Sequence, residues 1–217
     1  MDWSAKRSWA EGEHDRRLAA PAVEAERDDL RLAGIAGASW AGGLAALMLG
    51  DAAAASTLLV RAAEEYRTSW DAAPPGSWGR PIAMLRCRLM AGDVAGARAD
   101  AESTISAGAL DASGPIGGYC AVLALLVLGR DAEAGPLADR IEADGLDPAA
   151  VAQALAALAR GRDGDFAAAR RAVLASFEAR DAFLEDVAVA DTVLVLDALA
   201  RERGIETEDL RSALLPE

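Results

Sequence analysis

One short pattern recurs four times along this chain: a glycine, an aspartate or arginine, three variable residues and an alanine. The copies begin at Gly50, Gly92, Gly129 and Gly164, with spacings of 42, 37 and 35 residues. Each copy follows an apolar segment and precedes an amphipathic one. Self-similarity at such a period indicates that one structural unit is repeated along the chain.

The residue types in this pattern predict a helix hairpin. Glycine readily adopts the left-handed conformation that closes a first helix, and an aspartate after it can accept hydrogen bonds from the amides that open a second helix. The alanine one turn later lets the two helices approach closely. After Gly50, apolar residues from Ala55 to Tyr66 fall on one helical face and charged residues on the other. Such apolar faces must be buried against neighbouring hairpins.

Composition favours the same all-α class. Residues of the AVILMFWYC set make up 53% of the chain but aromatic residues only 5%, so alanine and leucine, which are strong helix formers, dominate. The breakers Pro74, Pro75 and Gly76 predict a longer loop between the first two hairpins. We also expect polar helices within residues 4–11 and 21–29, a long helix over residues 181–203, and a short final helix from Thr207 to Leu215.

The stretch from Leu128 to Ala134, followed by Leu146-Asp147-Pro148, resembles the second half of a tetratricopeptide repeat with its closing proline. The resemblance covers residues 35–200. It implies a right-handed stack of antiparallel helix hairpins, with residues 1–30 as an N-terminal helical cap and residues 31–217 as the repeat domain with a C-terminal capping helix. Gly135-Pro136 departs from this pattern, and we expect it to disturb the second helix of the third hairpin.

Net charge and apolar runs limit the partners and the location of the protein. The net charge of −13 would repel nucleic-acid phosphates and anionic lipids. Residues 1–17 lack the apolar core of a signal peptide, and the longest apolar run, 115–128, is shorter than the ~20 residues of a membrane-spanning helix. We therefore expect no nucleic-acid or membrane partner. Cys87 and Cys120 lie in apolar segments, which favours a reduced, cytoplasmic setting.

Basic residues are almost all arginine. Lys6 is the only lysine among 22 basic residues, which agrees either with a GC-rich genome or with an acidic surface adapted to high salt. A single lysine in a polar segment also leaves no phosphate-binding GxxxxGK loop and no well-placed Schiff-base lysine.

Several patterns that could carry catalysis or metal binding are better explained structurally. His14 is the only histidine, which excludes an HExxH zinc site, and we expect residues 11–15 around it to be a solvated charged segment. Residues 37–41 look like a nucleophile elbow without its closing glycine, so a close-packed helix is the better reading. No histidine or lysine lies near either cysteine to lower its pKa, so both thiols are expected to be inert. We predict no catalytic activity, no metal and no cofactor.

One stripe of residues suggests a binding surface. The positions ten residues before the four glycines hold Trp40, Ile82, Tyr119 and Ala154, and those four residues further on hold Leu44, Arg86, Leu123 and Leu158. In tetratricopeptide-like stacks such positions of the first helix tend to face the concave groove. Trp, Tyr and Arg are also the residue types that dominate binding energy when desolvated. The predicted partner-binding residues are therefore Trp40, Leu44, Trp78, Ile82, Arg86, Tyr119 and Leu123.

These observations predict a non-catalytic interaction protein that binds a peptide or helix of a protein partner in an apolar groove. One alternative is a small-molecule sensor or enzyme with an apolar cavity between helices, and another is a structural homo-oligomer such as a homodimer. The stripe could also be plain core, covered by the N-terminal helices or by a second subunit. Residues 117–128 favour such a cover, since a helix that is apolar on all sides must be buried on all sides.

Overall fold

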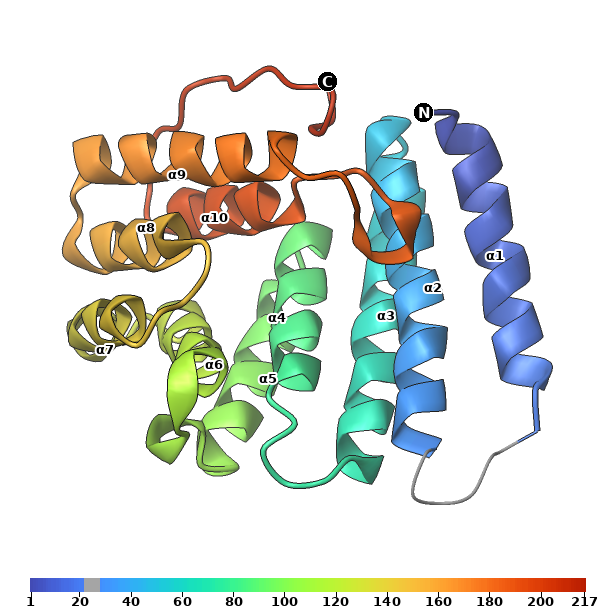
Figure 1. Ribbon diagram of the computed structural model, residues 1–217, viewed down its shortest axis with the longest axis horizontal. Helices are drawn as coiled ribbons and strands as arrows, with labels where there is room; N and C mark the ends of the chain where they lie inside the picture. The colour runs from blue at the N-terminus through green and yellow to red at the C-terminus, as the bar shows by residue number, and fades with distance from the viewer. Residues whose placement is uncertain (22–27) are drawn as a thin grey trace.

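The computed structural model describes residues 1–21 and 28–217, and every regular element within them is a helix (Figure 1). The longer elements are α1 (Trp3–Ala19), α2 (Asp28–Met48), α3 (Ala52–Ala72), α4 (Gly79–Ala91), α5 (Val94–Ser106), α6 (Gly114–Val127), α7 (Asp131–Ala143), α8 (Ala149–Arg160), α9 (Asp163–Glu178) and α10 (Asp191–Glu202). Two short 3-10 helices are η2 (Ala109–Asp111) and η3 (Leu184–Asp186).

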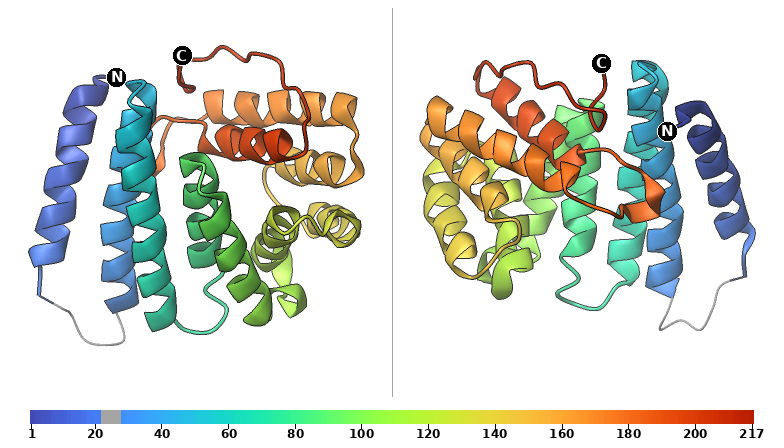
Figure 2. Two further views of the ribbon diagram at one scale, coloured as in Figure 1. Left: turned by 180° about the vertical axis from the view of Figure 1, so that it is seen from behind. Right: turned by 45° about the horizontal axis from the view of Figure 1, so that its top comes forward.

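Consecutive helices pack side by side as antiparallel hairpins, α2 with α3, α4 with α5, α6 with α7 and α8 with α9 (Figures 1 and 2). α1 packs against α2 at one end of this array, and α8 and α9 lie at the other. The predicted all-helical stack of hairpins is confirmed, while its right-handed sense stays a prediction. The polar helix expected at residues 4–11 lies within α1, whereas the one expected at residues 21–29 falls mostly outside the described residues.

The first three predicted turns have the expected left-handed glycine, and the first two also have the expected aspartate cap, whereas Arg130 makes no side-chain cap in the third. Gly50, Gly92 and Gly129 adopt left-handed φ angles of 72°, 72° and 71° at the ends of their helices. The side chain of Asp51 accepts a hydrogen bond from the Ala54 amide at 3.1 Å. Asp93 does the same for the third residue after it, at 2.9 Å. Each aspartate therefore satisfies one exposed amide at the start of a second helix.

The fourth turn lies three residues before the predicted position. Gly161, with φ of 61°, closes α8, whereas Gly164 lies inside the first turn of α9. The alanine of the pattern is replaced after Gly161 by Phe166, which is buried. The position ten residues before the true turn is therefore Val151 rather than Ala154.

The position of this turn predicts opposite effects on stability when each of two neighbouring glycines is replaced by alanine. Gly161→Ala should lower the free energy of unfolding by about 1–2 kcal/mol, because a Cβ is strained at its left-handed φ angle. Gly164→Ala should leave stability unchanged or raise it by up to about 1 kcal/mol, since its added Cβ would meet open space in a helix. Urea denaturation of both variants measures the difference. Equal losses of stability in the two variants would contradict the assignment of the turn to Gly161.

The second helix of the third hairpin continues through the expected disturbance. α7 runs unbroken from Asp131 to Ala143 with Pro136 inside it. Because Pro136 lies in the second turn, its missing amide removes one hydrogen bond, to the carbonyl of Ala132. Burial of the α7 face that carries Leu137 and Ile141 offsets that loss.

The C-terminal region differs most from the sequence prediction. α10 begins at Asp191, so the helix expected over residues 181–203 is half as long, and residues 179–190 form an irregular α9–α10 connection. The final helix predicted from Thr207 to Leu215 is absent from this described segment. Tertiary contacts take its backbone groups instead. The Glu208 carbonyl accepts a hydrogen bond from Arg170 at 3.0 Å, and the Leu214 carbonyl accepts one from the Ala190 amide at 2.8 Å.

This C-terminal region covers the side of the array on which the first helices lie. α10 packs against α4 and α8, and the α9–α10 connection reaches across to α2 (Figure 2). The apolar helix α6 is buried from Gly117 to Val127, as its composition predicts. α2 is the one described helix long and apolar enough to span a membrane, and 67% of its apolar window is buried inside the protein.

Candidate functional site

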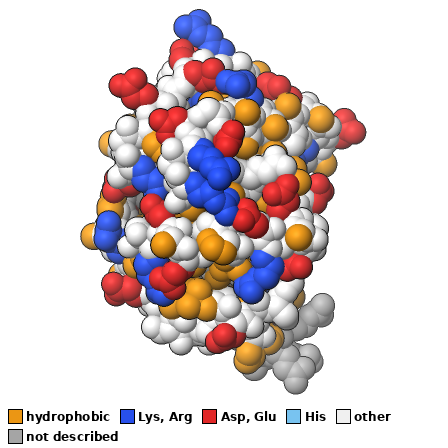
Figure 3. Space-filling model, turned by 90° about the vertical axis from the view of Figure 1, so that its left-hand side faces the viewer, with side chains coloured by type: hydrophobic (Ala, Val, Ile, Leu, Met, Phe, Trp, Pro, Cys, Tyr) orange, Lys and Arg blue, Asp and Glu red, His pale blue; other side chains and the backbone are white. Residues whose placement is uncertain are grey.

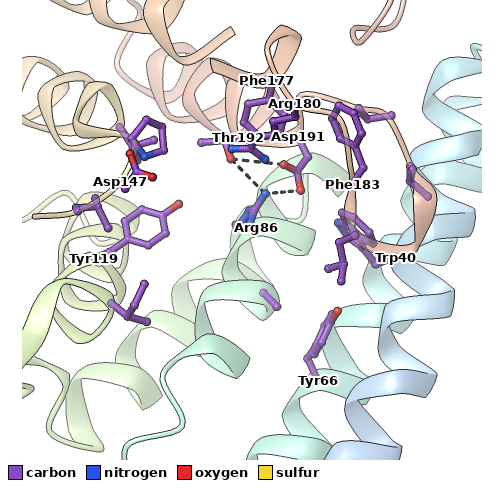
Figure 4. A pocket seen from close by; sticks show the side chains of 18 residues that line it. Trp40, Tyr66, Arg86, Tyr119, Asp147, Phe177, Arg180, Phe183, Asp191 and Thr192 are labelled. Carbon is purple, nitrogen blue, oxygen red and sulfur yellow. Dashed lines mark hydrogen bonds and ion pairs between the residues drawn. The ribbon is translucent and has the colours of Figure 1, made fainter. Parts of the chain in front are cut away.

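A cavity of about 270 Å³ lies between the two ends of the array, beneath the α9–α10 connection (Figure 4). Each of the four first helices contributes a side chain to its wall: Trp40 from α2, Arg86 from α4, Tyr119 from α6 and Val151 from α8. The N-terminal end of α10 and the connection close the opposite side. The repeated first helices therefore converge on one common space.

Aromatic side chains are concentrated in this wall. Both tyrosines of the chain, Tyr66 and Tyr119, line it, with two of the three phenylalanines, Phe177 and Phe183. Trp40 completes the set. In a chain with only 5% aromatic residues, half of the rings therefore gather at this cavity, where Trp40, Tyr66, Tyr119 and Phe177 also belong to the buried core. Figure 4 shows these rings arranged around a common space.

One charged pair is built into the wall. Nη2 of Arg86 contacts Oδ2 of Asp191 and donates to the hydroxyl of Thr192 at 3.3 Å (Figure 4). The Thr192 hydroxyl lies 3.4 Å from the other carboxylate oxygen of Asp191. The Asp191 side chain is 6% exposed, whereas that of Arg86 keeps 24% of its surface accessible in the cavity. Both residues line the cavity, and Arg86 exposes more of its surface there than Asp191 does.

Two features of the fold favour this ion pair. Asp191 is the first residue of α10, where the helix N-terminus favours a negative charge. Burial is the largest effect on Arg86 and opposes its charge, but the Asp191 carboxylate together with Tyr119, Cys87 and Tyr66 outweighs it, so the Arg86 pKa is raised above its usual value. Burial also raises the pKa of Tyr119, so its hydroxyl stays protonated and available as a hydrogen-bond donor.

The cavity opens at a mouth with two apolar and two charged side chains. Ile116 and Leu184 are 53% and 67% exposed there. Arg180 and Asp147 are the charged rim residues, and both are exposed. The Arg180 guanidinium lies over the Phe177 ring, 3.7 Å from its centroid, which is a cation–π contact. No carboxylate among the described residues forms an ion pair with Arg180.

The α9–α10 connection holds a strained conformation over this mouth. Glu185 and Asp186 have positive φ angles of 51° and 52°, which cost about 1–3 kcal/mol each outside glycine. Glu185 is fixed by Arg17 of α1, whose two terminal nitrogens lie 2.7 and 3.0 Å from its carboxylate oxygens. Val187 and Val189 are buried beside α2. These contacts hold the helix-breaking conformation that the sequence did not predict.

The predicted partner-binding residues fall into three groups. Trp40, Arg86 and Tyr119 meet at the cavity. Leu44, Ile82 and Leu123 are buried in the core, and Trp78 is half-buried at the start of α4 against α6. Reasoning from the sequence missed the lining residues that come from other elements, namely Tyr66, Phe177, Phe183, Asp191 and Thr192. The scarcity of aromatic residues was the signal that could have drawn attention to the rings.

Residues 11–15, expected to be solvated, are instead part of α1 and include a buried contact. His14 is buried, and its Nε2 lies 2.8 Å from Oε1 of Glu65 in α3. The Ser39 hydroxyl donates to the other oxygen of Glu65 at 2.6 Å. This network joins α1 to the first hairpin, and the close packing of residues 37–41 in α2 is confirmed. No group of His, Cys, Asp or Glu suited to a metal ion occurs among the described residues.

Both cysteines are free and buried. Burial raises the pKa of Cys87 to about 12 and that of Cys120 to about 12. We therefore expect neither thiol of the folded protein to react with Ellman's reagent at pH 8 within minutes, and both to react once urea unfolds it. Rapid labelling of the native protein would contradict this burial.

Charges of both signs are interspersed on the outer end of the array, around α7 to α9 (Figure 3). Arg160 pairs with Asp139 there, and Arg130 pairs with Glu133. This face therefore does not concentrate the net negative charge of the chain.

Comparison of the chain with protein-family models, curated proteins and solved structures found no match. Its function is therefore inferred from the cavity.

Proposed function

We propose that this protein is a non-catalytic helical array that binds a small, largely apolar molecule in the cavity between its first helices. The sequence alone favours a partner peptide in an open groove, with a small ligand as the alternative. In the structure, α10 and the α9–α10 connection lie over the first helices. Because they cover the groove that a peptide would occupy, we favour a small ligand over a peptide. The proposal depends on one observation: five aromatic side chains surround a single cavity, although the chain contains few aromatic residues.

The size and chemistry of the cavity support a ligand of metabolite size. Its 270 Å³ lies near the lower end of the ~300–1,000 Å³ of small-molecule pockets, which combine apolar walls with a few polar groups. The two tyrosines and the Arg86–Asp191 pair in its wall are poorly suited to proton transfer near neutral pH. Arg86 and Asp191 are paired, and burial raises the pKa of both tyrosines. Binding without catalysis is the reading that these groups support.

Thermal unfolding in the presence of a metabolite panel tests this proposal. At least one small apolar compound should raise the melting temperature of the wild-type protein, since a ligand that binds only the folded state stabilises it. Trp40→Ala should abolish the shift, and Trp9→Ala, which changes an exposed ring on α1, should preserve it. Ala83→Leu, which adds bulk inside the cavity, should also abolish the shift without removing an aromatic wall. Equal shifts in all four proteins would contradict the proposed site.

A protein partner is the second candidate, and the mouth is the observation that favours it. Ile116 and Leu184 expose apolar surface directly beside the cavity, so a partner could insert one side chain while covering this rim. An Ile116→Asp/Leu184→Asp variant should then lose the partner without losing a small ligand. A homodimer through the same rim would appear as a doubled mass in light scattering that this variant restores to the monomer value.

A further inference from the structure

We propose that the ligand is a small carboxylic acid with an aromatic or branched apolar body, whose carboxylate contacts Arg86 and Arg180 from the cavity side. This inference rests on the proposed function, because it names the chemical class that the same cavity would accept. Aromatic walls alone would accept any apolar molecule of suitable size. The arrangement of the charges selects among the anionic, neutral and cationic forms.

The first observation is that Asp191 is compensated more than once. Arg86 and the Thr192 hydroxyl contact its two carboxylate oxygens, and the N-terminus of α10 adds a further favourable field. Asp191 lines the cavity beside Arg86, but only 6% of its side chain is exposed, against 24% for Arg86. Its negative charge is therefore largely neutralised, and most of the surface that the pair presents to a ligand belongs to Arg86.

The second observation is that Arg86 retains unused hydrogen-bond donors. A guanidinium carries five N–H groups on three nitrogens. Nη2 makes both described contacts of Arg86, to Asp191 and to Thr192, and Nε is buried without a partner among the described residues. With a quarter of its side-chain surface facing the cavity, Arg86 can donate further hydrogen bonds to an acceptor on a ligand. Charge-assisted bonds of this kind are stronger than neutral ones.

The third observation is a second cation at the mouth. Arg180 lines the cavity, is exposed, and pairs with no carboxylate among the described residues. Its contact with the Phe177 ring holds the guanidinium at the rim. In Figure 4, Arg180 and Arg86 lie on either side of Asp191, and the Tyr119 hydroxyl is directed toward the same space. An anion entering past Arg180 would therefore meet Arg86 and could accept a hydrogen bond from Tyr119.

One carboxylate at the mouth opposes the positive charges of Arg86 and Arg180. Asp147 is exposed at the mouth, where water screens its charge. The two carboxylates of η3 face other partners or solvent, since Glu185 pairs with Arg17 and Asp186 is exposed. A cationic ligand would have to use Asp147 alone and place its charge beside two guanidinium groups. An anionic ligand would instead be attracted by two guanidinium groups and repelled by Asp147.

Three compounds that share one ring separate these possibilities: 3-phenylpropionate, 3-phenylpropionamide and 3-phenylpropylamine, which are anionic, neutral and cationic at pH 7. Isothermal titration calorimetry should show that the acid binds the wild-type protein roughly tenfold or more tightly than the amide, as expected for a hydrogen bond to a charged group. The amine should bind more weakly still. Arg180→Gln should remove several-fold of the affinity for the acid and leave the amide unchanged, while Arg180→Lys should retain most of it.

Loss of the Arg86 charge provides a second variant. In Arg86→Met/Asp191→Leu the buried pair is replaced as a unit, so the fold is kept, while the preference for the acid over the amide should fall to the several-fold part that Arg180 supplies. Equal affinities of acid and amide for the wild-type protein, or tighter binding of the amine, would overturn this inference and leave the proposed function standing. Failure of all three compounds, together with no shift from the metabolite panel, would overturn the proposed function as well.

Discussion

Replacing Asp191 by alanine should lower the free energy of unfolding by about 3 kcal/mol. The variant leaves the Arg86 guanidinium in the wall without its carboxylate, and an uncompensated charge in a largely buried site is strongly destabilising. We place the effect at the lower end of the usual range, because Arg86 keeps a quarter of its surface in the cavity and can be partly hydrated there. Urea denaturation followed by circular dichroism measures the change.

Two further variants make this prediction specific. Asp139→Ala breaks the exposed pair with Arg160 and should change stability by less than about 1 kcal/mol. Arg86→Met/Asp191→Leu should recover most of the stability lost in Asp191→Ala, because it removes both charges and fills the same space. If Asp191→Ala were as stable as the wild-type protein, the pair would not organise the cavity wall.

Leu123→Ala should cost about 3 kcal/mol of stability, within the range of about 2–5 kcal/mol for leucine truncations in cores. Leu123 lies on α6 with 0% of its surface exposed, so its truncation leaves a void among the surrounding helices. Leu44 on α2 is equally buried, and Leu44→Ala should behave alike. Thermal and urea unfolding of each variant give the size of the loss.

The matched control for these truncations is Leu18→Ala. Leu18 lies on α1 and is 58% exposed, so its loss should change stability by no more than about 0.5 kcal/mol. This comparison also separates two roles for residues that the sequence grouped together. A stable Leu123→Ala protein with impaired binding would mean that Leu123 contacts a partner directly, and would contradict the buried position described above.

Local turn chemistry made much of the array predictable. Gly50, Gly92 and Gly129 each require the left-handed conformation that few other residues adopt, so the pattern located three of the four hairpin turns. The fourth was shifted because Phe166 replaces the small alanine after Gly161, while Gly164 happens to be followed by an alanine at the expected distance. Whether a large ring fits where two helices cross depends on the space available in three dimensions, which a sequence pattern does not describe.

The cavity was predictable only in part, for a similar reason. Trp40, Arg86 and Tyr119 come from equivalent first helices, so aligning the repeats brought them together. Phe183 lies in the irregular α9–α10 connection, whose sequence favours helix, and Asp191 begins the helix that follows it. The contact of Glu185 with Arg17, 168 residues away in the chain, and the burial of Val187 outweigh that local preference. Such long-range contacts are invisible to propensity and periodicity.

A crystal of the protein soaked with 4-iodobenzoate tests the central claim most directly, because iodine scatters anomalously and the acid matches the proposed ligand class. We predict an anomalous peak inside the cavity, among Trp40, Tyr66 and Phe177, with the carboxylate directed toward Arg86 and Arg180. An occupied site on the outer surface, with only solvent between the first helices and the α9–α10 connection, would contradict the account.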